Sequence, residues 1–176
     1  MGQVKLYSVR EANLYIDGAN MAGRVESVDL PDIVTKTIEK RSLSMIGAID
    51  VPIGFEKMTG KIAFTALFED AALKMSNPFK SVKLMLRSNI KTFTGGGWAD
   101  DDSIPLVTYL TATFNKIPLG GFKAGDEAKF ETEYSCSYVK QVLDGKDIIE
   151  FDPFNNVFKV GGEDQLAAFN IDLGTN

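Results

Sequence analysis

Residues 128–142 alternate between two kinds of side chain over almost their whole length. The positions expected to face a core are Phe130, Thr132, Tyr134, Cys136 and Tyr138, and those expected to face water are Lys129, Glu131, Glu133, Ser135 and Ser137. A repeat of two is the repeat of an extended strand, whose side chains point alternately to its two faces. The segment therefore predicts a long strand in an antiparallel sheet that has one buried and one wet face.

The same alternation recurs in shorter segments. In residues 106–114 the inward positions are Leu106, Leu110, Ala112 and Phe114, and residues 61–68 and 81–90 repeat the pattern. Asp17–Gly18, Gly120–Gly121 and Asp144–Gly145 are turn signals between extended runs. One segment reads as a helix: Glu69 and Asp70 place acid at its start, and Asn77–Pro78 ends it.

These patterns predict a mainly β protein, an antiparallel β-sandwich or barrel of about seven to nine strands with one short α-helix. A chain of 176 residues can bury a core, and we expect a single domain, residues 1–176. The net charge of -5 argues against sequence-independent DNA binding, which needs a basic surface. No signal peptide is visible, and no apolar stretch approaches the roughly 20 residues of a membrane helix, so we expect a soluble protein made in the cytoplasm.

Catalytic chemistry has little support in the sequence. The chain has no histidine, which excludes a Ser-His-Asp triad and histidine metal sites. Cys136 is the only cysteine, and its place in an alternating strand favours a small buried hydrophobe over a nucleophile. Glu131 and Glu133 could form a carboxylate pair such as glycosidases use, but paired surface acids are common. We expect no enzyme activity and no cofactor.

Residues 41–58 are unusual because they combine loop residues with many apolar side chains. The segment contains two glycines and a proline, and its apolar residues are Leu43, Met45, Ile46, Ile49, Val51, Ile53 and Phe55. A loop of this length is uncommon inside a compact domain, and a disordered one would be polar. The sequence predicts either an extended loop that contacts a partner or a loop that folds back on its own core.

Residues 94–103 form a second unusual segment, in which three glycines and Trp98 precede the acid run Asp100, Asp101 and Asp102. A phosphate-binding loop needs Gly-Lys-Ser/Thr and a following helix, and three carboxylates would repel phosphate. The carboxylates could bind Mg²⁺ or Ca²⁺, although consecutive acids lack the spacing of a calcium loop. We predict a surface loop in which Trp98 is either a core plug or an interface anchor.

Several ordered segments resemble one protein family. They are residues 13–18, the run from Val25 to Pro31 with its Leu-Pro step, residues 41–55, and the ending that runs from Tyr134 through Leu143-Asp144-Gly145-Lys146 to Gly162. This series resembles the major tail tube proteins of contractile-tailed phages (P2-like) and R-type bacteriocins. The middle of the chain, about residues 77–126, matches only in its order of elements.

The resemblance implies a structural subunit of a contractile tail tube, made of stacked hexameric rings whose lumen conducts DNA or a tape measure protein. The apolar loop 41–58 would pack on neighbouring subunits and is our candidate for the contact between rings. Glu131 and Glu133 would line the lumen and repel DNA, and Trp98, Asp100, Asp101 and Asp102 would meet the sheath. The implied partners are the chain itself, the tail sheath, tape measure, baseplate and tail terminator proteins, with DNA passing without specific binding. The implied location is the virion tail, assembled in the host bacterial cytoplasm.

Two other functions fit the same patterns. A type VI secretion tube shares the fold of these tail tubes, although the Leu-Asp-Gly-Lys ending and the Leu-Pro step favour the phage type. A β-sandwich carbohydrate-binding module or glycosidase would instead show exposed aromatic residues on a concave face. The alternation places the tyrosines mostly inward, which argues against that function.

Overall fold

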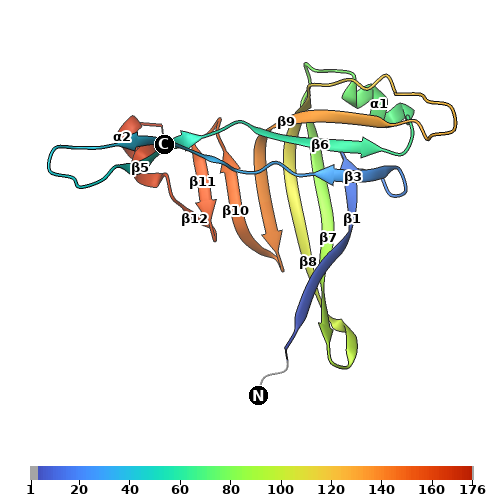
Figure 1. The fold of residues 1–176 in the computed structure, drawn as a ribbon, viewed down its shortest axis with the longest axis horizontal. Coiled ribbons are helices and arrows are strands. Elements are labelled where there is room, and N and C mark those ends of the chain that lie inside the picture. Colours follow the sequence, from blue (N-terminus) through green and yellow to red (C-terminus); the bar gives the residue numbers. More distant parts are fainter. Residues whose placement is uncertain (1–3, 176) are drawn as a thin grey trace.

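The longest alternating segment forms strand β9 (Phe130–Leu143), whose two halves belong to two layers. The first half pairs antiparallel with β6 (Met58–Phe64), and the second half pairs with β8 (Gly97–Phe114). β9 therefore folds one continuous antiparallel sheet over on itself, and the main core lies between the two layers. Figure 1 shows the result: the long strands lie side by side along one axis, with alternating directions, and β3, β6 and the start of β9 cross above them.

The computed structural model describes residues 4–175, apart from the side chains of residues 100–102. The larger layer has the spatial order β12 (Glu163–Asp164), β11 (Val157–Val160), β10 (Lys146–Asp152), β9, β8, β7 (Val82–Thr94), β1 (Leu6–Ile16) and β2 (Ala19–Asn20). The smaller layer contains β3 (Val25–Asp29), β6 and the first half of β9. A separate hairpin consists of β4 (Thr35–Lys40) and β5 (Ile49–Phe55), and the helices are α1 (Glu69–Met75) and α2 (Ala167–Leu173).

The predicted class, a mainly β antiparallel fold, is confirmed. The predicted helix is confirmed as α1, with Glu69 and Asp70 in its first turn. The expectation of a single helix is wrong, because the described chain also contains α2. The predicted number of seven to nine strands is too low, since the described residues form twelve strands, two of which contain only two residues.

The core is built from the inward faces predicted by the alternation. Ile62, Phe64, Phe114 and Tyr134 are almost completely buried, and the rings of Phe114 and Tyr134 meet edge to face at 6.2 Å. The Tyr134 hydroxyl donates a hydrogen bond to the carbonyl oxygen of Asp29, at 3.0 Å, which satisfies its polar end inside the core. This bond ties β9 to β3 across the smaller layer.

The alternation of β9 fails beyond Cys136 because of a β-bulge. Ala112 pairs with Cys136 and Thr111 pairs with Tyr138, so Ser137 is an extra residue on β9. An extra residue moves all later side chains to the opposite face. Val139 is therefore buried, and the inward orientation predicted for Tyr138 is wrong.

Two of the three predicted turns are confirmed. Asp17–Gly18 and Asp144–Gly145 join paired strands, and all four residues have positive φ, as a type I′ hairpin turn requires. Gly120–Gly121 is not a hairpin turn, because it lies in the long connection between β8 and β9. The strand predicted over residues 61–68 is displaced, since β6 ends at Phe64 and the chain then turns into α1.

Three groups on β9 link the stability of the fold to alkaline pH. Burial raises the pKa of the Cys136 thiol from 9.0 to about 12. Burial, together with the hydrogen bond that Tyr138 donates to Glu150, raises the pKa of the Tyr138 phenol from 10.0 to about 12. Burial also raises the pKa of Tyr134. The folded chain therefore keeps protons that the unfolded chain loses, so stability falls as pH rises.

We expect the melting temperature to hold steady from neutral pH to about pH 9 and then to fall progressively toward pH 12. The Cys136→Ala variant lacks the group that titrates first, so its decline should begin closer to pH 10, where an unfolded tyrosine loses its proton. Circular dichroism melts at stepped pH values test this. A wild-type melting temperature that stays constant up to pH 12 contradicts the prediction.

Candidate assembly surfaces

The β4–β5 hairpin, residues 35–55, projects sideways from the body, and we call it the arm (Figure 1). The sequence predicted a long loop over residues 41–58, and these bounds are wrong. Ile49–Phe55 pairs with Thr35–Lys40, so only residues 41–48 connect the two strands, and Met58 already begins β6. Strand pairing gives these backbone N–H and C=O groups partners within the chain, which in an open loop would be bonded to water.

The register of the arm gives it two unlike faces. Ile38 lies opposite Val51, and Lys40 lies opposite Ile49, whereas Glu39 lies opposite Asp50. Residues opposite each other in an antiparallel pair share a face, and neighbours along a strand alternate. One face is therefore apolar with lysines along β4, and the other carries the acids Glu39 and Asp50.

The seven residues predicted as an inter-subunit interface all lie in the arm, but they differ in how far they are exposed. Leu43, Ile46, Ile49 and Ile53 are exposed, and the Leu43 side chain is 98% exposed. Met45 and Val51 are half-buried. Phe55 instead packs against the core of its own subunit. The alternative prediction, that the segment folds back on its own core, thus holds for Phe55 alone among these seven.

Aromatic packing fixes the base of the arm. The Phe55 ring lies 4.7 Å from the Phe151 ring on β10 and 4.9 Å from the Phe158 ring on β11, measured between centroids. The Glu56 backbone N–H also donates to the Val34 carbonyl oxygen at 2.8 Å. These contacts hold the two ends of the arm together and join it to the larger layer.

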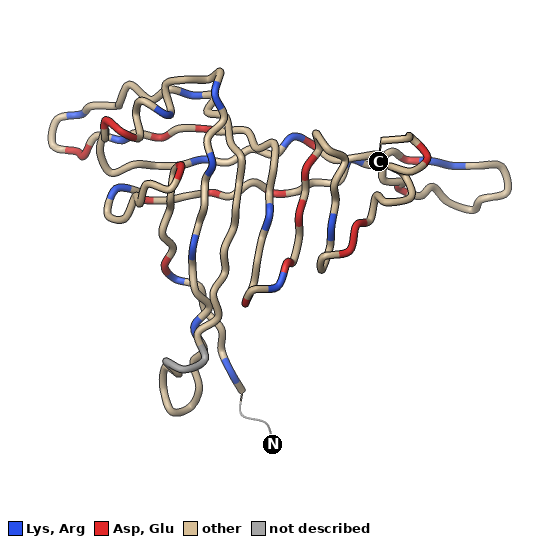
Figure 2. The backbone as a smooth tube through the Cα atoms, turned by 180° about the vertical axis from the view of Figure 1, so that it is seen from behind, with Lys and Arg blue, Asp and Glu red and all other residues tan. Residues whose placement is uncertain are grey.

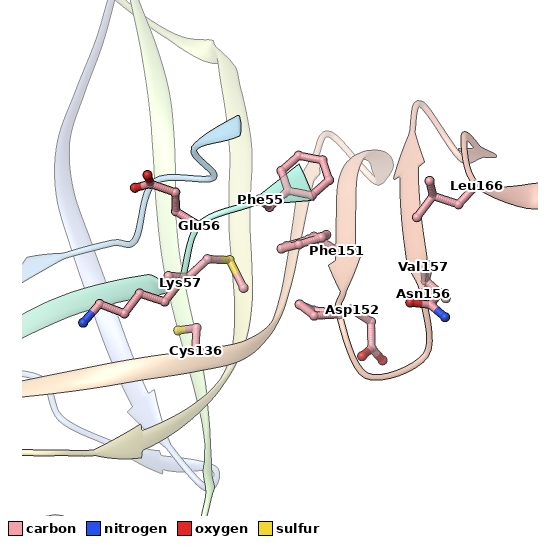
Figure 3. A pocket seen from close by; sticks show the side chains of 11 residues that line it. Phe55, Glu56, Lys57, Cys136, Phe151, Asp152, Asn156, Val157 and Leu166 are labelled. Atoms are coloured by element: carbon pink, nitrogen blue, oxygen red, sulfur yellow. The ribbon is translucent and has the colours of Figure 1, made fainter. Parts of the chain in front are cut away.

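A cavity of about 340 Å³ lies beside this aromatic group, between the β5–β6 link and the β10–β11 turn (Figure 3). Its lining includes Phe55, Met58, Cys136, Phe151 and Leu166. The half-buried Cys136 has a raised pKa, so its thiol is protonated at neutral pH and is a poor nucleophile. Among the described residues, no group of three or more acidic, cysteine or histidine side chains could hold a metal ion.

Glu131 and Glu133 project from the outer face of the smaller layer and belong to a cluster of four charges. Lys61 lies 3.9 Å from Glu131 and 3.8 Å from Glu133. Lys116 lies 3.6 Å and 3.7 Å from the same two carboxylates. The two lysines balance the two acids, so this cluster of four side chains has no net charge. Figure 2 shows acidic and basic residues interspersed along the chain.

Trp98 lies near the end of the β7–β8 hairpin, which extends beyond the body (Figure 1). It pairs with Phe93 across the hairpin, with ring centroids 5.1 Å apart, and the Arg10 guanidinium lies 5.0 Å from the indole centroid. Trp98 is 45% exposed, so of the two predicted roles the core plug is wrong. The segment also forms strand rather than the predicted loop, apart from the hairpin end.

The side chains of Asp100, Asp101 and Asp102 lie outside the described residues. Their backbone lies in β8 where the ladder is irregular. Ile104 pairs with Ile90 and Ala99 pairs with Thr92, so residues 100–103 face Lys91 alone. This stretch therefore bulges from the strand, which is how an acid run fits within an otherwise regular hairpin.

The tyrosines do not point mostly inward, which corrects an argument from the sequence. Among the described tyrosines only Tyr134 is buried, and Tyr7 and Tyr109 are exposed. Tyr15, Tyr109 and Tyr138 line a groove of about 520 Å³ on the face of the larger layer opposite the core. The orientation of the tyrosines therefore does not weigh against carbohydrate binding.

No helix within residues 4–175 is long and apolar enough to cross a membrane.

Comparison with known proteins supports the tail tube function among those that the sequence left open. A family model described as phage tail tube protein FII matches residues 7–174. The tail tube protein of Escherichia phage P2 is 24% identical over 166 residues, which cover 92% of this chain and 94% of that protein. The major tail tube protein of Serratia phage KSP20 is 25% identical over 157 residues, which cover 88% of each.

Solved structures with a similar fold come from an extracellular contractile injection system. One chain of the PVC sheath–tube complex in the extended state has a TM-score of 0.54 at 14% identity, over 74% of this chain and 87% of that chain. One chain of the PVC sheath/tube terminator in the extended state has the same TM-score at 12% identity, over 74% of this chain and 92% of that chain. At sequence identities this low, the structural similarity shows a shared fold alone.

Proposed function

Because the chain belongs to the phage tail tube protein FII family, we propose that it assembles into hexameric rings that stack into the inner tube of a contractile tail. The chain is a tail tube protein, a structural component of a virion tail or phage-tail-like particle. The number of subunits in a ring, and passage of DNA or a tape measure protein through the lumen, are parts of the proposal. A tube subunit needs no catalytic group, and we propose no enzyme activity.

The arm is the observation that carries this proposal. It displays Leu43, Ile46, Ile49 and Ile53 outside the body, where a monomer gains nothing from them. Exposed apolar segments of this kind mark protein–protein contacts. Met45 and Val51 belong to the same interface, and Phe55 anchors it to the body.

Ring closure requires a head-to-tail contact between two different surfaces. The larger layer ends in β12 on one side and in β1 and β2 on the other, and the described ladder partners of Leu6–Asn13 all lie on β7. We propose that these edges pair between neighbouring subunits, which extends the sheet around the lumen and removes its free edges.

The charges suggest which residues line the lumen of the tube, and the exposed Trp98 suggests where a sheath contacts its outer surface. A net charge of -5 favours a wall that repels DNA. Glu131 and Glu133 are proposed lumen residues, with their repulsion reduced by Lys61 and Lys116. Trp98, with Asp100, Asp101 and Asp102, is the proposed contact with a sheath. We further propose that tape measure, baseplate and terminator proteins meet the tube inside and at its ends, and that assembly takes place in the host cytoplasm.

Negative-stain electron microscopy across a concentration series, with light scattering for mass, tests the proposal. We expect rings or hollow tubes of uniform diameter, with sixfold end views. Samples seeded with preformed tube fragments remove the dependence on nucleation. A strictly monomeric protein at every concentration, with seeds present, contradicts the tube function and favours a binding module.

A further inference from the structure

Helix α2 buries a polar side chain and exposes apolar ones, which is the reverse of an ordinary surface helix. Its one buried side chain is Asn170, which is 6% exposed, whereas Phe169, Ile171 and Leu173 are exposed. An amphipathic helix normally turns its apolar residues toward the core. An outward apolar face is stable in a soluble assembly when another surface covers it.

Among the described residues, one side-chain hydrogen bond links α2 to the body. The Asn170 side-chain N–H donates to the Asn156 carbonyl oxygen at 3.0 Å, which anchors the helix to the β10–β11 turn. The Thr175 hydroxyl donates to the Asn170 carbonyl oxygen at 3.2 Å. Gly174 ends the helix in the left-handed conformation, with φ 65°. With Asn170 turned inward, Phe169 and Ile171 lie on the two exposed flanks of the helix, and Asp172 lies between them on the outward side.

The surface that fits this helix is present on the same chain. The apolar face of the arm contains Ile38, Ile49 and Val51, and Lys36 and Lys40 alternate with Ile38 along β4 on that face. Around α2 acids outnumber bases: Asp172 lies in the helix, and Glu163 and Asp164 form β12, while Lys159 lies opposite Asp164 and pairs with Glu150. Within the described part of the chain, no ion pair forms at Lys36, Lys40, Glu163, Asp164 or Asp172.

We propose that the apolar, basic face of the arm docks on the apolar, acidic face of α2 in a second copy of this chain. The inference rests on the proposed tube function and identifies the surface that receives the arm. Apolar area meets apolar area, and the lysines meet Asp172, Glu163 and Asp164, so each surface supplies what the other lacks. The two surfaces differ, so the contact is heterologous and can repeat from copy to copy.

Thiol labelling tests whether α2 is covered. Ile171→Cys in a Cys136→Ser background reports on the helix, and Leu73→Cys on the exposed side of α1 is the matched control. In wild-type-like tubes free of sheath, we expect maleimide to label Ile171→Cys about tenfold or more slowly than in a monomeric arm variant, with a smaller change at Leu73→Cys. Equal rates in tube and monomer overturn the proposal. Protection that appears only after sheath is added overturns it too, because the occupant is then the sheath.

Cross-linking tests the identity of the partner surface. A variant with Ile49→Cys and Ile171→Cys, assembled into tubes and treated with a short bis-maleimide, should give a ladder of covalent multimers, and neither single variant should do so. Tubes without a ladder show that α2 is not the receptor of the arm, and the tube function stands. Failure of the wild-type chain to form any ring or tube contradicts the proposed function itself.

Discussion

Ile49→Asp combined with Ile53→Asp should abolish polymerisation and leave a folded, soluble subunit. Both side chains are exposed on the arm, so the substitutions remove nothing from the core. At an interface each would place a carboxylate among desolvated apolar groups, and such changes cost about 2 kcal/mol or more per contact. Every subunit in a tube repeats the loss. Light scattering and electron microscopy measure assembly, and circular dichroism measures the fold.

Thr35→Asp combined with Thr37→Asp is the matched control for the arm. Both threonines are exposed on β4, on the face away from Ile38 and Ile49, and the variant adds the same charge to the same hairpin. We expect this variant to assemble more readily than the isoleucine variant. If the isoleucine variant aggregates or unfolds, the arm is part of the monomer core and the interface proposal is wrong.

Gly60→Ala should destabilise the fold strongly, although it adds only one methyl group. Gly60 lies in β6 directly opposite Tyr134, and an added Cβ would lie within 2.5 Å of the Tyr134 ring, its hydroxyl and the Asp29 carbonyl oxygen. Real Cβ atoms do not approach so closely, so the ring must move and its hydrogen bond to Asp29 breaks. Overpacking and a lost buried bond together cost about 3 kcal/mol. Urea unfolding measures the change.

Gly47→Ala is the control for this substitution. Gly47 lies in the loop of the arm, a Cβ added there would have no other atom within 4 Å, and the φ of Gly47 is not positive. We expect a change in the free energy of unfolding within about 0.5 kcal/mol of zero. In the Gly60→Ala background, Tyr134→Leu should recover part of the loss because it removes the blocking ring. A Gly60→Ala variant as stable as the wild type contradicts the close packing of Tyr134 on β6.

The regular part of the fold was predictable because its signals are local. Phe130, Thr132 and Tyr134 alternate with charged residues, and burial follows that pattern. Asp17–Gly18 and Asp144–Gly145 have the backbone freedom that tight hairpins need, and they form such turns. α1 begins at the acids and ends before the Asn-Pro pair, as predicted. The ordered series of segments also sufficed to indicate the tail tube family, which the comparisons confirm.

The arm and α2 were not predictable in detail because neither buries its apolar residues within the chain. All six residues of β4 are exposed, so no alternation marks them as a strand, and they pair only with β5. The apolar residues of α2 face outward, which removes the periodic signal of a core-facing helix. Residues that stay exposed in the chain carry no burial pattern from which the element they form could be predicted.

By itself, then, the sequence determined the mainly β class, the hairpin turns, the first helix and the family, because burial periodicity and turn chemistry depend on neighbouring residues. The tertiary structure alone decided that β9 serves two layers, that the bulge at Ser137 turns Tyr138 outward, and that Glu131 and Glu133 face two lysines. These features depend on which distant strands pair, and in which register. A shift of one residue in that pairing reverses which side chains reach the core.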